Sequence, residues 1–283
     1  MKGEKLSAPK IYWTLLALAA TLPLVILLER LPFEAVDWRA YQKISDIWHP
    51  FQTEGIFNPP WTFWLIWLLL KIPMYQTGVV RLLIVASVAA VVVRRGGKWW
   101  ELLAVATSLP FVYLVANGNI DWLAGLAFLI PHHGASLILL SIKPQVGVLA
   151  ALAWLRRNGW YILLPILFVF ALSLAVYGWW PAQALENIRW MDHGKGLLRM
   201  KWNVSLFPWT VPLGLWLAWK AWKKGDEFYG VSATLLLSPY FAAYTLTFWY
   251  ILALKRRSLA AVSWIGMWAW YFLLFRRGLW PLF

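Results

Sequence analysis

Long stretches without a charged side chain limit this fold more than any other feature of the sequence. They span residues 11–28, 102–120, 122–142, 161–177, 229–254 and 258–275. An α-helix needs roughly 17–25 such residues to cross the hydrocarbon core of a bilayer. The alternating ten-residue pattern of a membrane β-barrel is missing from the sequence. The pattern therefore predicts an all-α protein of the integral membrane type.

Composition and charge point the same way. Hydrophobic residues make up 61% of the 283 residues and charged residues only 13%, about half the charge of a soluble domain. The net charge is +14, and short basic clusters lie between apolar runs, which is the pattern of cytoplasmic loops. These clusters are Arg94-Arg95-Lys98, Arg156-Arg157, Lys223-Lys224 and Lys255-Arg256-Arg257. No basic soluble module is visible, so we expect no nucleic-acid partner. The absence of cysteine excludes disulfides and thiolate metal sites.

We expect a single transmembrane domain over residues 1–283, a polytopic bundle of about ten apolar segments, several of them short, re-entrant or broken by proline. The segments lie near 11–28, 61–72, 79–93, 100–116, 120–131, 135–155, 161–177, 206–222, 231–252 and 258–275. Hydrophilic loops are predicted near 29–58 and 178–204, and a bend in segment 231–252 at Ser238-Pro239.

The basic residues also predict an orientation. Lys2, Lys5 and Lys10 precede the first segment, so the N-terminus should be cytoplasmic and loop 29–58 external, in a multi-pass protein of the cell membrane. Two segments separate that loop from Arg94-Arg95, although opposite sides require an odd number of crossings. Either one of these two segments is re-entrant, or Arg94-Arg95 departs from the charge rule.

Asp37 is the first candidate functional residue. The chain has 12 acidic residues, and loop 29–58 holds Glu29, Glu34, Asp37, Asp46 and Glu54. A carboxylate at the membrane surface, with its pKa raised by partial burial near another acid such as Asp46, could act as a general base. The alternative is that Asp37 and Arg39 form surface ion pairs on a solvated loop.

Two polar sites interrupt apolar runs further along. Gly118-Asn119 predicts a turn, after which Asn119 or Asp121 caps a helix whose free N–H groups could bind phosphate; a plain cap is the alternative. Lys143-Pro144 places a lysine at membrane depth, where it needs a partner such as a lipid phosphate, unless it reaches the interface by snorkelling.

The second loop and the aromatic residues complete the candidates. Arg189, Lys195 and Arg199 could clamp an anionic leaving group, or belong to a solvated loop. Most of the 24 tryptophans fit interfacial belts, but those in the loops could stack on sugars. We assign an acceptor or sugar site to Trp38, Arg39, Tyr41, Asp46, His49, His193 and Tyr244.

In their order along the chain, these motifs resemble the GT-C glycosyltransferases, and most closely family 87, the polyprenyl-phosphate-mannose-dependent mannosyltransferases. The resemblance runs from about residue 10 to residue 255. The matching residues are Asp37, Tyr41, Phe57 with Pro59-Pro60, Gly118-Asn119, Lys143-Pro144, and Ser238-Pro239 with Tyr244.

The resemblance implies a GT-C-like fold and a membrane glycosyltransferase that acts on the outer face. The donor would be a sugar, mannose by family habit, on a polyprenyl phosphate, and the acceptor a glycan, glycolipid or protein hydroxyl. Transfer would invert the anomeric carbon, with Asp37 as base. Donor phosphate binding would fall to Lys143, Arg189, Lys195, Arg199, Gly118 and Asn119. We expect no metal and no cofactor, since the lipid-linked sugar is a substrate.

Two other functions stay open at this point. A transporter or flippase of lipid-linked sugars would share the buried lysine and the broken helices. The other alternative is a non-catalytic membrane subunit of the cell envelope.

Overall fold

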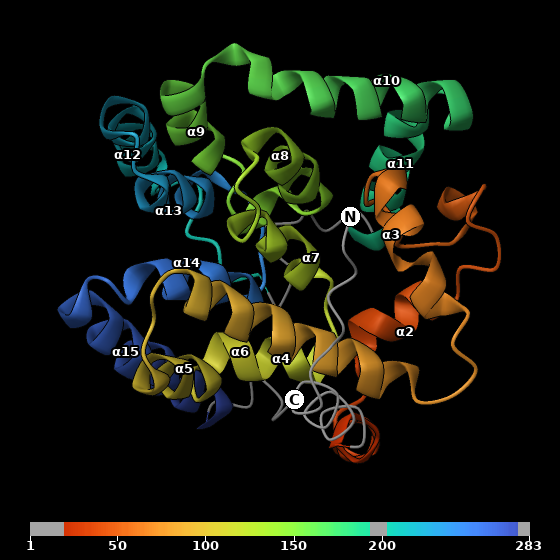
Figure 1. The fold of residues 1–283 in the computed structure, drawn as a ribbon, viewed down its shortest axis with the longest axis horizontal. Helices are drawn as coiled ribbons and strands as arrows, with labels where there is room; N and C mark the ends of the chain where they lie inside the picture. Colours follow the sequence, from red (N-terminus) through yellow and green to blue (C-terminus); the bar gives the residue numbers. More distant parts are fainter. Residues whose placement is uncertain (1–19, 193–202, 277–283) are drawn as a thin grey trace, which may run out of the picture.

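The computed structural model describes residues 20–192 and 203–276, and helices are the regular structure of this described part (Figure 1). The helix described from Ala20 ends at Glu29. The elements before the long central helix are α2 (Val36–Gln42), η1 (Pro50–Gln52) and α3 (Pro60–Leu70). The predicted all-helical class is therefore confirmed, whereas the GT-C topology stays a prediction.

The middle of the chain is a series of short, interrupted helices. It comprises α4 (Gln76–Arg94), α5 (Trp99–Ala106), α6 (Leu109–Asn117), α7 (Asp121–Gly125), η2 (Leu126–Phe128), α8 (His133–Ile142), η3 (Pro144–Val146) and α9 (Ala150–Asn158). The last part comprises η4 (Trp160–Leu163), α10 (Leu164–Tyr177), α11 (Trp180–Asp192), α12 (Val211–Lys224), α13 (Glu227–Leu237), η6 (Ala243–Thr245), α14 (Leu246–Ala253) and α15 (Arg257–Arg276).

Fewer helices are long enough to cross a membrane than the apolar runs predict. Within the described residues, α4 and the continuous stretch Trp160–Tyr177 are long and apolar enough. The pair α5 and α6, bent by 63°, makes a third if it forms one broken span. Of the predicted segments, two or three are therefore long enough to span a membrane, and ten spans are not shown. Short and interrupted helices were expected and are present. Hydropathy averages over a run and does not see where the helix stops inside it.

Prolines mark several of these interruptions. Pro110 lies in the first turn of α6, directly after the bend from α5, where a missing N–H is tolerated. Pro144 separates α8 from η3. Helix α3 begins at Pro60, as predicted, and α13 ends at Leu237, immediately before Ser238-Pro239. Local sequence therefore dictates where these helices start and stop.

The lengths of α3 and α4 bear on the crossing problem. Helix α3 has 11 residues and is too short to span a bilayer, whereas α4 has 19 residues and is about 28 Å long. One full-length helix therefore separates loop 29–58 from Arg94-Arg95. This arrangement fits the alternative in which the other segment does not cross.

Both predicted hydrophilic loops contain helices. Loop 29–58 includes α2 and η1, and α11 occupies residues 180–192 of the second loop. The structure does not describe residues 193–202. In Figure 1, α10 runs along the top edge of the molecule, and α7 lies centrally between α8 and α4. The chain therefore places α7, which carries Asp121, inside the protein.

Candidate active site

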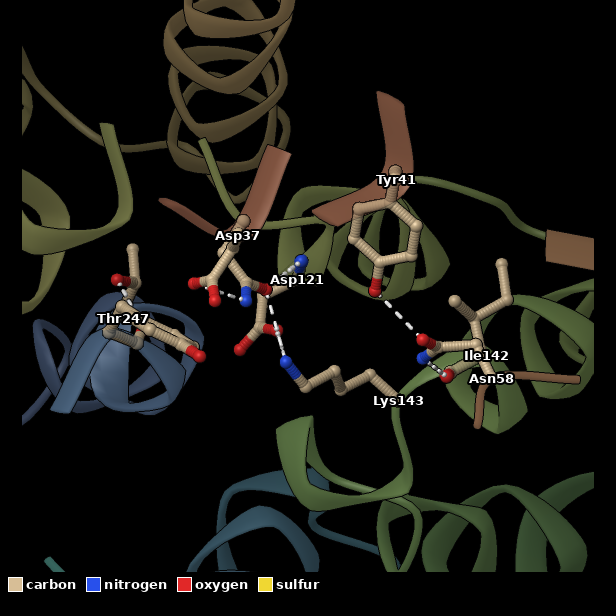
Figure 2. Close-up of polar contacts among 9 residues, drawn as sticks. Asp37, Tyr41, Asn58, Asp121, Ile142, Lys143 and Thr247 are labelled. Atoms are coloured by element: carbon tan, nitrogen blue, oxygen red, sulfur yellow. Dashed lines mark hydrogen bonds and ion pairs between the residues drawn. The ribbon is translucent and has the colours of Figure 1, made fainter. Parts of the chain in front are cut away.

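A polar cluster lies where α2, the α6–α7 turn, α7, the α8–η3 junction and η6 meet (Figure 2). It gathers Asp37, Asn119, Asp121, Lys143 and Tyr244, which come from four separate parts of the sequence. Asn119, Asp121, Lys143 and Tyr244 are buried, and Asp37 is partly exposed. Carboxylates and an amine at this depth are costly to desolvate, so their partners decide whether the cluster is stable.

Asn119 connects the members of the cluster. Its Nδ2 donates to Asp37 Oδ2 at 2.9 Å, and its Oδ1 accepts from Lys143 Nζ at 3.1 Å. The same Oδ1 accepts from the backbone N–H of Asp121 at 2.9 Å. That N–H group is therefore occupied and is not available to a phosphate. Asn119 orients Asp37 instead.

Lys143 forms an ion pair with Asp121, at 2.9 Å between Nζ and Oδ1. Its ammonium also lies 5.1 Å from the ring centre of Tyr244, within cation–π range. With 8% of its surface exposed, Lys143 does not snorkel. The partner that the sequence left open is Asp121, for which the sequence predicted only the role of a helix cap.

The charges of the cluster argue against Lys143 as the main phosphate ligand. Asp37 and Asp121 carry two negative charges when ionised, against one positive charge on Lys143. A phosphate beside them would face a net negative site. Asp121 Oδ2 accepts no hydrogen bond within the described part of the chain, so the cluster keeps a free acceptor. An uncharged hydroxyl suits such a site better than an anion does.

Burial raises the pKa of Asp37 above its usual value. The charge of Lys143 and hydrogen bonds from Asn119 and the Tyr244 hydroxyl act in the opposite direction and favour the carboxylate. The charge of Asp121 adds to the raising effect. Asp37 is therefore a stronger base than an exposed aspartate, and the groups around it still support its ionised form.

A turn at Gly118 sets the distance between α2 and the α6–α7 turn. Gly118 has φ +62°, a left-handed conformation that glycine adopts without cost. A Cβ added there would lie 3.0 Å from the Cβ of Trp38. Trp38 is fully buried, so its predicted role in sugar stacking is wrong: the ring packs under Gly118 and supports the site.

Tyr41 continues the polar contacts toward an apolar cavity. Its hydroxyl donates to Asn58 Oδ1 at 2.8 Å, and Asn58 Nδ2 donates to the Ile142 carbonyl at 3.0 Å. Asn58 and Tyr240 are among the lining residues of a cavity of about 480 Å³. The rest of its wall is mostly apolar and comes from α3, the α8–η3 region, α10 and α11. Asp37 itself does not line this cavity.

Arg81 supports the segments that carry the site, although no sequence motif singled it out. The side chain is fully buried. Its Nε donates to the Val115 carbonyl, and its terminal nitrogens donate to the carbonyls of Leu28, Phe33 and Ala116. These carbonyls belong to the segments that lead into Asp37 and Gly118. An arginine inside an otherwise uncharged stretch was the available signal.

Other predicted residues lie away from the cluster. Asp46 pairs with His49 at 2.7 Å on the surface, and that hydrogen bond lowers the pKa of Asp46. Asp46 is thus not the acid that acts on Asp37. Arg39 is exposed beside Glu34, at 3.7 Å, and Arg189 is exposed on α11. His193, Lys195 and Arg199 fall outside the described residues.

Comparison with known proteins adds no assignment. No family model, no curated protein and no solved structure matches this chain. In the described residues, no group of three histidine, aspartate or glutamate side chains is placed to hold a metal. The polar cluster itself is therefore the basis for a functional assignment.

Proposed function

We propose that the protein is a membrane glycosyltransferase in which Asp37 is the general base. The observation that carries this proposal is the partly exposed residue Asp37, whose carboxylate Asn119 orients and the Lys143–Asp121 pair adjoins. Burial gives Asp37 the raised pKa that suits a base. The sequence resemblance to family 87 supplies the reaction class.

The donor is a hexose, mannose by that resemblance, on a polyprenyl phosphate. The apolar cavity beside Asn58 and Tyr240 supports a lipid substrate, because an isoprenoid chain needs an apolar path beside the reacting groups. A lipid donor also accounts for a reaction centre inside a membrane protein.

The reaction is one displacement at the anomeric carbon. The acceptor hydroxyl oxygen forms a bond to that carbon while the bond from carbon to phosphate oxygen breaks. Asp37 takes the hydroxyl proton, and the polyprenyl phosphate leaves with the electron pair. The configuration inverts because attack comes from the side opposite the leaving group.

Base catalysis and binding of the leaving phosphate are assigned to different residues. Tyr244 and Asn119 hold the Asp37 carboxylate, and the Lys143–Asp121 ion pair lies beside it. Because the cluster is negative overall, we propose that the charge of the leaving phosphate falls to Lys195 and Arg199 of the second loop, which lie outside the described residues. This assignment shifts phosphate binding from Lys143 to that loop. Arg189 is exposed on α11, away from the cluster.

The experiment uses the purified full chain in nanodiscs, a radiolabelled polyprenyl phosphate mannose and octyl mannoside as acceptor. We expect transfer, and a loss of about 100- to 10,000-fold in Asp37→Asn, the usual contribution of a general base. Glu34→Gln is the matched control, since Glu34 is an exposed acid of the same loop outside the cluster.

Full activity of Asp37→Asn would exclude Asp37 as the base. If the protein moves the intact donor across a proteoliposome membrane and transfers no sugar, it is a transporter and not a glycosyltransferase. If the protein does not bind the donor, it is not a polyprenyl-phosphate-sugar-dependent glycosyltransferase.

A further inference from the structure

A second polar cavity, of about 550 Å³, lies far from Asp37, where the C-terminal ends of α4, α9, α12 and α14 meet. Its charged lining residues come from four segments: Arg95, Arg157, Asp226 with Glu227, and Lys255 with Arg256. We call it the basic cavity. Three of the four basic clusters that the sequence shows therefore line a single hollow.

The acids of the basic cavity are already neutralised. Glu227 pairs with Arg95 at 2.7 Å and also accepts from Trp154 Nε1 at 3.1 Å. Asp226 pairs with Arg256 at 2.9 Å. Arg157 and Lys255 pair with no acid in the described part of the chain. Four cations against two carboxylates leave an excess of two positive charges.

The donors left over are suited to an oxyanion. The Nε of Arg95 is buried and has no hydrogen-bond partner among the described residues. The stem of Arg157 packs against Gly225, where an added Cβ would lie 3.3 Å from its Cγ. An arginine fork and a lysine bind phosphate in complementary ways, one by paired hydrogen bonds and the other as a point charge.

Exposed aromatic residues indicate the depth of the basic cavity. Trp99, directly after Lys98, is 76% exposed, and Trp160, directly after the Arg157 segment, is 69% exposed. Trp160 and Trp222 lie 6.4 Å apart between ring centres, and Trp222 precedes Lys223. Exposed tryptophans next to basic residues are typical of the membrane–water interface. This pattern is the argument for placing the basic cavity at the depth of lipid headgroups.

We propose that the basic cavity binds the phosphate of an anionic membrane lipid headgroup, with Arg157 and Lys255 as its ligands. Arg95 and Arg256, held by their acids, form the wall behind the phosphate. The headgroup depth favours a lipid over a free phosphate ion. Basic pockets between membrane helices are known to hold such headgroups.

The test compares two charge-matched double variants of the full chain. R157Q with K255Q removes the two free cations of the basic cavity. K220Q with K223Q removes two lysines that lie over Trp216 and Trp219 and line no part of it. Native mass spectrometry measures the phosphatidylglycerol retained from nanodiscs that mix it with phosphatidylcholine.

We expect the wild type and the K220Q/K223Q variant to retain phosphatidylglycerol in preference to phosphatidylcholine. In the R157Q/K255Q variant, that preference should fall at least tenfold. Equal retention by both double variants would overturn the proposal, because general surface attraction would then explain binding. Should the double cavity variant fail to fold, K255Q alone decides, since Lys255 is exposed and its loss leaves the packing intact.

A second arm separates lipid from free phosphate. Inorganic phosphate and glycerol phosphate are added to the chain in pure phosphatidylcholine nanodiscs, and the thermal midpoint is recorded. We expect neither to raise it as phosphatidylglycerol does. Stabilisation by inorganic phosphate to the same extent, lost in the cavity variant, would identify a soluble anion as the ligand and exclude the lipid.

Discussion

At the scale of single residues, two charges act on Asp37 in opposite directions. Lys143 lowers the pKa of Asp37, and Asp121 raises it, on top of the larger effect of burial. We therefore expect Lys143→Gln to raise the pKa of Asp37, so that the carboxyl stays protonated to higher pH. Asp121→Asn should lower it. The acidic limb of the pH–rate profile should move up in pH in the first variant and down in the second.

The ionisation can be followed without activity. The carboxyl-stretch infrared signal that disappears in Asp37→Asn reports the protonation of this one group. Shifts of the same sign in both variants would mean that packing changes, and not the two charges, set the ionisation of Asp37.

The Lys143–Asp121 pair makes a separate prediction about stability. Both side chains are buried, so loss of one partner leaves an uncompensated charge, and each of Lys143→Met and Asp121→Asn should cost about 3–5 kcal/mol. The double variant should cost much less than the sum. Chemical unfolding in detergent measures the cycle, and additive costs would show that the pair is not coupled.

At the scale of elements, α7 packs closely on α14 through Gly125. A Cβ at Gly125 would lie 1.8 Å from Cζ of Phe248, a contact that cannot exist without movement. We expect Gly125→Ala to cost about 1–3 kcal/mol and to displace Asp121, which lies on the same short helix. Thermal unfolding gives the cost, and the Asp37 infrared signal reports the displacement.

Gly266→Ala is the matched control, since Gly266 is a helical glycine of α15 with open space around its Cα. There alanine should stabilise by about 0.5–1 kcal/mol through helix propensity alone. A loss of stability equal to that of Gly125→Ala would show that the close contact with Phe248 is not the cause.

The elements also show what the sequence could and could not predict. Pro60, Gly118 and Ser238-Pro239 act on their own backbone, and the breaks that they predict are present. Helices that stop halfway through an apolar run need distant partners for their last carbonyls. Arg81 supplies such partners across long sequence separations, which periodicity cannot detect.

The same distinction holds for the candidate site. Asp37, Asn119, Lys143 and Tyr244 were predicted and do lie together. Asp121 was undervalued because a helix cap accounts for an aspartate locally, whereas its ion pair depends on tertiary structure. Asp46 was grouped with Asp37 by sequence distance, but its local turn directs it toward His49.

At the scale of the whole molecule, α4 separates two polar regions of opposite character. Arg81 and the segments that carry Asp37 lie near its first turns, and Arg95 of the basic cavity follows its last residue. About 20 Å of helix separates Arg81 from Arg95. The acid-containing cluster and the excess of positive charge are thus held apart by one rigid element.

Arg81 joins that element to the rest of the chain and carries the last prediction. Its donors satisfy four carbonyls from the first described helix, from residue 33 before α2 and from the end of α6. Arg81→Lys keeps the charge but cannot reach these separate acceptors from one ammonium. We expect a loss of at least about 3 kcal/mol in unfolding, because several buried carbonyls lose a charged donor. Arg94→Lys, at the exposed far end of the same helix, should stay within about 0.5 kcal/mol of wild type. Equal effects of the two variants would mean that the charge of Arg81, and not its planar fork, holds these segments together.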